Sequence, residues 1–144
     1  MEALYARLRD VDEAGTYRLN CQPDELHKAA TQAGLALFEA DLAAVQGKGE
    51  FLAAVAQAAK APEWFGHNWD ALADALGDLS WHPAPGYVLL LRGSGEKLGL
   101  STEERAIATG IFAGTVGFWK SQGKPFWIFY LKVKKPRPMD VVIT

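Results

Sequence analysis

Two aspartates, Asp70 and Asp74, lie four residues apart in the segment PEWFGHNWDALADAL, residues 62–76. At the period of an α-helix, about 3.6 residues per turn, this spacing puts both carboxylates on one face, which Asp78 extends. Like charges at this spacing cost a few tenths of a kcal/mol, so folding alone gives no reason for the pair. A solubilising face is one interpretation, and a binding surface for a basic partner is the other. The opposite, apolar face is expected to hold Trp69, Leu72, Leu76 and Leu79.

The residues just before this helix are aromatic and polar. Trp64, Phe65 and His67 surround Gly66 in a stretch whose composition predicts a surface loop. Aromatic side chains are enriched at the energetic centre of protein interfaces, although packing into the core is the alternative for at least one of them. We expect Gly66 to permit a backbone conformation or a close approach that a side chain would forbid. Asn68 is placed to cap the helix.

The elements that must position these residues alternate between strands and helices. Apolar runs bounded by turn residues predict strands at 15–20, 35–39, 87–93 and 125–131. Helices are predicted at 23–34, at 49–61, from 69 onward, and from 102 to about 122, the last opened by a capping box of Ser101 and Glu104. Strands separated by helices predict an α/β fold with a small parallel sheet packed with helices.

Glycines interrupt the last long helix. Gly110, Gly114 and Gly117 each cost up to about 1 kcal/mol relative to alanine in a helix interior. We expect them to permit close packing of this helix on the sheet.

The bulk composition fits a globular chain in a reducing compartment. The chain has 144 residues, 49 % of them hydrophobic, and Cys21 is its single cysteine. The first residues include no apolar stretch typical of a signal peptide, and the longest apolar runs are far shorter than a membrane span. We therefore expect a cytoplasmic protein without a membrane segment.

The sequence holds no strong pattern of a catalytic or metal-binding site. His27, His67 and His82 have no metal-ligand spacing to one another or to the cysteine. The glycine-bearing loop RGSGEKLG lacks the sequence of a phosphate loop, and no set of groups with complementary catalytic roles is visible. We expect a protein that is not an enzyme and that uses no metal or cofactor.

Charge is distributed unevenly along the chain. Residues 1–100 carry 8 Lys and Arg against 14 Asp and Glu, whereas residues 101–144 carry 7 against 3. An acidic body favours a basic partner. The basic run KVKKPRP, residues 132–138, is either a patch for nucleic acid or a solvated tail, and we favour the tail.

The segment 62–76 resembles the signature of the barstar family, intracellular inhibitors of secreted ribonucleases. The family pattern runs Pro, Glu, two aromatics, Gly, one variable residue, Asn, one apolar residue, Asp-Ala-Leu, and a second Asp four residues after the first; every position is filled here. The similarity extends over residues 35–131. It implies a barstar-like domain there. The pattern of the chain outside this region predicts an added N-terminal βα unit of the same domain at residues 1–34 and a tail at residues 132–144. The end of that tail, MDVVIT, has the composition of an added edge strand.

The resemblance also implies which residues bind a partner. Asp70 and Asp74 would enter the basic active site of a nuclease, where carboxylates can occupy the position of a phosphate through charge-assisted hydrogen bonds. The loop would pack around that site. Two departures bear on the target, because Ala73 stands where the family has a large aromatic, and Phe118 lies where the family has a further acidic contact. The expected partner-binding residues are Trp64, Phe65, Gly66, His67, Asn68, Asp70, Ala73 and Asp74.

These observations predict a cytoplasmic, immunity-type protein inhibitor of a basic, secreted ribonuclease. We expect a monomer that forms a 1:1 complex with its target and does not itself bind nucleic acid. Two alternatives stay open. One is a barstar-like interaction module for a basic partner that is not a nuclease, and the other is weak RNA binding through the basic C-terminal segment.

Overall fold

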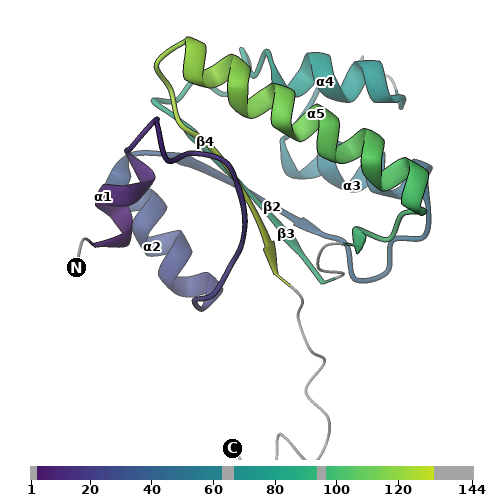
Figure 1. Ribbon diagram of the computed structural model, residues 1–144, viewed down its shortest axis with the longest axis horizontal. Helices are drawn as coiled ribbons and strands as arrows, with labels where there is room; N and C mark the ends of the chain where they lie inside the picture. The colour runs from purple at the N-terminus through teal and green to yellow at the C-terminus, as the bar shows by residue number, and fades with distance from the viewer. Residues whose placement is uncertain (1–2, 63–66, 94–96, 132–144) are drawn as a thin grey trace, which may run out of the picture.

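In the part of the chain that the structure describes, four parallel strands form the central sheet. The computed structural model describes residues 3–62, 67–93 and 97–131 (Figure 1). The strand order is β1-β4-β3-β2, and every neighbouring pair is parallel. This small parallel sheet with helices packed on it confirms the predicted α/β class. The strands are β1 (Thr16–Arg18), β2 (Ala36–Asp41), β3 (Tyr87–Arg92) and β4 (Phe126–Leu131).

Helices cover both faces of the sheet. Figure 1 shows α1 and α2 on one side, and α3, α4 and α5 on the other. Because both faces are covered, the first five residues of β3 and of β4 are all buried, which explains their continuous apolar sequences. The helices are α1 (Leu4–Leu8), α2 (Pro23–Ala33), α3 (Lys48–Ala58), α4 (Trp69–Leu76) and α5 (Thr102–Ser121).

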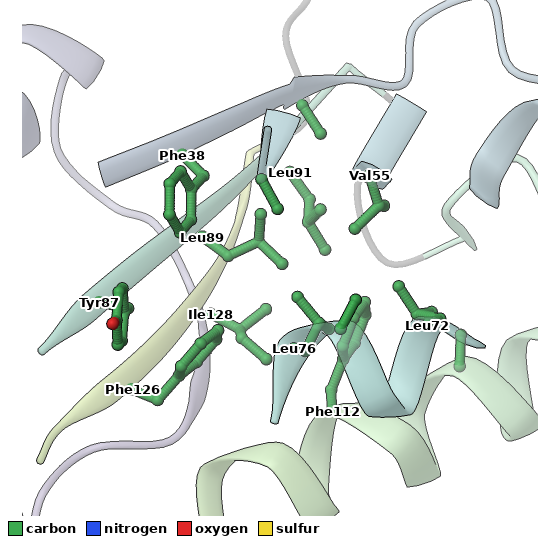
Figure 2. Packing of buried hydrophobic residues seen from close by; sticks show 14 of the residues in the cluster. Phe38, Val55, Leu72, Leu76, Tyr87, Leu89, Leu91, Phe112, Phe126 and Ile128 are labelled. Carbon is green, nitrogen blue, oxygen red and sulfur yellow. The ribbon is translucent and has the colours of Figure 1, made fainter. Parts of the chain in front are cut away.

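The larger hydrophobic core lies between the sheet and the three helices α3, α4 and α5. Figure 2 shows Leu89 and Ile128 of the sheet facing Leu72 of α4 and Phe112 of α5. All four side chains are at most 1 % exposed. This core fixes the position of α4, the helix that carries the two aspartates.

The N-terminal segment forms a second, smaller core on the other face. Leu26 and Ala30 of α2 pack in one cluster with Val88 and Leu90 of β3. The indole Nε1 of Trp127 donates a hydrogen bond of 2.8 Å to the carbonyl oxygen of Leu8, which holds α1. The segment therefore extends the sheet through β1 and lies on the face opposite α4. The sequence did not predict α1.

The expectation for the glycines of α5 was wrong. Gly110, Gly114 and Gly117 are exposed, and a Cβ atom added at each would meet nothing within 4 Å. They do not serve close packing on the sheet, because the side chains that face it are others, among them Ala108, Phe112 and Trp119. The expected edge strand in MDVVIT lies outside the described residues.

Candidate functional site

The first turn of α4 is held by its cap. Asn68 has an extended backbone, and its Oδ1 accepts a hydrogen bond of 2.7 Å from the backbone N–H of Ala71, which confirms the predicted cap. Trp69, half-buried, follows directly, with its ring centroid 6.0 Å from that of Phe51 in α3 and 5.9 Å from Lys48 Nζ. The start of the acidic helix is thus tied to α3.

The last turn of α4 and the residues after it are bonded to α5 and to the end of α3. The indole Nε1 of Trp119, in α5, donates a hydrogen bond of 2.8 Å to the carbonyl oxygen of Leu76. This bond satisfies one of the carbonyl groups that a helix C-terminus leaves without an intrahelical donor. Just beyond the helix, Trp81 Nε1 donates to the carbonyl oxygen of Ala59 at 2.9 Å. The cap at Asn68 and the packing of Trp69 on α3 therefore anchor the start of α4, and the bond from Trp119 anchors its end.

The two aspartates project from this anchored helix. Asp70, Ala73 and Asp74 are exposed. Among the residues that the structure describes, neither carboxylate makes an ion pair or a side-chain hydrogen bond. Asp70 lies in the first turn, where the helix dipole favours a negative charge, whereas Asp74 is too far along to gain much from it. The pair presents two negative charges that are available to a partner.

Asp78 does not continue the helical face, contrary to expectation. The helix ends at Leu76, and Leu79 has a left-handed backbone (φ 51°) and a buried side chain. Asp78 is exposed in the intervening turn, where its Oδ2 accepts a hydrogen bond of 3.2 Å from Ser80 Oγ. Of the expected apolar face, Leu72, Leu76 and Leu79 are buried as predicted, and Trp69 is half-buried.

Part of the predicted binding loop is placed by the structure. His67 is exposed beside the cap residue Asn68, at the same end of α4 as Asp70. Trp64, Phe65 and Gly66 lie outside the described residues, so their contribution stays a prediction.

A groove of about 360 Å³ lies beside Asp74, between α4 and α5. Sequence reasoning missed it, because its two walls are formed by segments far apart in the chain. The signal that could have indicated it is the concentration of small residues on facing turns of two neighbouring helices. The lining residues are Ala73, Asp74 and Gly77 on one wall and Ile111, Gly114, Thr115 and Phe118 on the other.

A larger cavity, about 550 Å³, lies across the sheet near α1 and β1. Trp127 and Phe129 stack in it with their ring centroids 5.7 Å apart, and Cys21 lies at its wall. Burial, assisted by the charge of Glu25, raises the pKa of the Cys21 thiol above its usual value. The thiol is therefore less ionised than an ordinary cysteine, which argues against a nucleophilic role.

A charged cluster on the α2 side of the sheet is separate from the two aspartates. Glu39 Oε1 lies 2.7 Å from His27 Nε2, and Glu39 Oε2 accepts a hydrogen bond from Arg92. Burial opposes the ionisation of Glu39, but the bonds from Arg92 and His27 outweigh it and hold the pKa of this carboxyl below its usual value. We interpret this cluster as structural.

Neither a metal-binding cluster nor a membrane-spanning helix is found among the described residues. No group of three or more His, Cys, Asp or Glu side chains there is arranged to hold a metal ion. None of the helices in this part of the chain is both long and apolar enough to cross a membrane.

The family of the chain follows from a sequence comparison. A family model described as Barstar (barnase inhibitor) matches residues 35–131. The chain belongs to the barstar family. The matched region runs from β2 through β4 and includes α4 with both aspartates, whereas α1, β1 and α2 precede it. Members of the barstar family are inhibitors rather than enzymes. No curated protein matches this chain.

Proposed function

We propose that this protein is an intracellular, non-catalytic inhibitor of a basic ribonuclease, of the immunity type. The observation that carries the proposal is the pair of exposed carboxylates of Asp70 and Asp74 on an anchored helix, which have no side-chain partner among the described residues. Membership of a family described as barnase inhibitors supports the nature of the target.

The chemistry of a ribonuclease active site fits this surface. Such a site must gather cationic side chains around a phosphate. Carboxylates held on a rigid helix replace the phosphate and form charge-assisted hydrogen bonds with those cations. Because α4 is capped at Asn68 and bonded at Leu76, little conformational entropy is lost when the partner binds.

The remaining predicted residues would surround this centre. In the proposed complex, Trp64, Phe65, Gly66 and His67 pack against the enzyme around its active site, and Asn68 holds the helix that follows. The complex has one inhibitor per enzyme. The inhibitor blocks access of RNA and takes no part in a chemical step.

A second candidate is a barstar-like module for a basic partner that is not a nuclease. Two residues that line the groove, Ala73 and Phe118, favour it. The resemblance implies a large aromatic residue at the position of Ala73 and an acidic contact at the position of Phe118. RNA binding through residues 132–138 rests on a segment outside the described residues, and it remains a prediction from sequence alone.

The deciding experiment measures the activity of a panel of basic bacterial ribonucleases, barnase included, with and without the purified protein. An Asp70→Ala/Asp74→Ala variant should lose most of the inhibition. The matched control is Asp24→Ala/Glu25→Ala, which removes the same charge from exposed positions of α2, across the sheet. Loss of inhibition in both variants, or in neither, would reject the site. Failure of the wild-type protein to inhibit any enzyme, with capture of a basic protein without nuclease activity, would favour the second candidate.

A further inference from the structure

We infer that the groove between α4 and α5 is an apolar subsite that receives one protruding side chain of the partner, next to the cations that bind Asp70 and Asp74. The inference rests on the proposed function, because it concerns the same face. The occupant is a leucine, methionine or aromatic side chain on the surface of a basic ribonuclease.

The groove has the form of a side-chain pocket. Its volume is about 360 Å³, with Ala73 and Gly77 on the α4 side and Gly114 on the α5 side. Beneath it the two helices are held together by buried Leu76 and Phe112, which Figure 2 shows in the core. The groove is therefore a surface feature over a closed core.

The small residues of the groove are not required by the fold. Gly114 is exposed, and a Cβ atom there would meet nothing within 4 Å, so alanine would fit and would favour the helix. Ala73 is exposed as well, where a longer side chain has room to leave the surface. Packing of the chain on itself gives no reason for the space, whereas insertion of a partner's side chain does.

An aromatic side chain forms one end of the groove. Phe118 is 44 % exposed, and its ring packs edge-on against Trp119 with 5.2 Å between the centroids. Trp119 is itself bonded to Leu76 of α4, so Phe118 is supported by a rigid neighbour. Exposed aromatics of this kind are typical of the residues that dominate binding energy at interfaces.

The negative charge beside the groove favours a basic partner over a second copy of this chain as its occupant. Asp74 lines it, and Asp70 lies one turn away on the same helix face. A second copy of the chain related by two-fold symmetry would bring these carboxylates against each other, which is unfavourable. A basic partner brings its cations to the carboxylates and its neighbouring apolar side chain over the groove.

The test fills the groove without changing charge. Gly114→Leu places a side chain in the groove, and Gly110→Leu, one turn earlier on α5, is the matched control, because Gly110 is equally exposed and does not line it. Inhibition constants and dissociation rates are measured with the ribonuclease that the wild-type protein inhibits best in the panel that includes barnase. We expect Gly114→Leu to weaken inhibition by about tenfold or more through faster dissociation, and Gly110→Leu to change it less than about twofold.

A second pair of variants tests the end of the groove. Phe118→Ala should also weaken inhibition, whereas Ile107→Ala, at an apolar residue of α5 that is 45 % exposed and outside the groove, should not. Thermal unfolding of all four variants checks that each is folded. If Gly114→Leu and Phe118→Ala inhibit as the wild type does while the double aspartate variant fails, the groove is rejected and the proposed function stands. If the wild-type protein inhibits no ribonuclease, both are rejected.

Discussion

Trp119 and Leu76 join α4, the helix that carries Asp70 and Asp74, to α5. The indole Nε1 of Trp119 donates to the carbonyl oxygen of Leu76 at 2.8 Å, and the ring is 7 % exposed. The same ring lies 5.2 Å from that of Tyr87, at the start of β3. One side chain thus connects the end of α4, α5 and the sheet, and it sets where the carboxylates lie relative to the groove.

Trp119→Phe should destabilise the protein. The change keeps an aromatic ring but leaves the Leu76 carbonyl group without its donor, which costs about 1–3 kcal/mol when the group is buried. Chemical denaturation monitored by far-UV circular dichroism gives the free energy of unfolding. Ile107→Ala, at an exposed site of the same helix, serves as the control. A Trp119→Phe variant as stable as the control would show that this bond does not anchor α4.

Asn68→Ala should weaken the first turn of α4. The variant loses the hydrogen bond from the Ala71 N–H to the Asn68 side chain, and loss of such a cap costs about 1 kcal/mol. Asn68→Ser, which keeps a capping oxygen, should retain most of the stability. Thermal and denaturant unfolding of the two variants measure the difference. Equal stability would mean that Asn68 acts through some other contact.

Much of the fold could be predicted from the sequence because its signals are local. The apolar runs beginning at Tyr87 and Phe126 each describe a strand buried on both faces, and the structure has strands there. The Asn68 cap and the capping box of Ser101 with Glu104 are local as well, and both are present. The period of α4 correctly separated its buried leucines from its exposed aspartates.

The features that sequence reasoning missed depend on contacts between distant residues. The five-residue helix α1 is held by the bond from Trp127 to Leu8, which joins positions 119 residues apart. The groove beside Asp74 exists only because Ala73 and Gly114, on different helices, come together. The sequence predicts a packing role for the glycines of α5 because their cost in helix stability can be estimated from it. Their exposure cannot.

Acid should remove the contribution of Glu39 to stability. The folded-state pKa of this carboxyl lies below its ordinary value of 4.5, so the interactions of the ionised carboxylate with Arg92 and His27 stabilise the protein above that pH. The contribution is lost as the pH falls from there through the folded-state pKa. Glu39→Gln should therefore be less stable than the wild type at pH 7, and the difference should narrow below about pH 4.5.

The matched control for this prediction is Glu103→Gln. Glu103 is an exposed carboxylate in the first turn of α5, outside the cluster of Glu39, Arg92 and His27. Urea denaturation of both variants and of the wild type is measured from about pH 3 to about pH 7, a range that includes the ordinary carboxyl pKa. The result is the difference in free energy of unfolding between each variant and the wild type as a function of pH. A gap for Glu39→Gln that is constant with pH would show that the lost stability comes from packing and not from ionisation.

Salt should slow the binding of the proposed target. The exposed carboxylates on α4 attract a basic active site over distances that salt screens, and the Debye length falls from about 30 Å at 0.01 M to about 3 Å at 1 M. Stopped-flow measurement with the inhibited ribonuclease should show an association rate that falls by about tenfold or more over this range.

The two double variants separate local attraction from net charge. Asp70→Ala/Asp74→Ala and Asp24→Ala/Glu25→Ala have equal net charge, but only the first removes the charges of α4. The first should associate slowly at low salt and respond weakly to added salt, whereas the second should follow the wild-type curve closely. Identical curves for the two variants would mean that the overall charge of the protein, and not the carboxylates of α4, attracts the partner. The position of two side chains on one anchored helix then could not explain the rate of association.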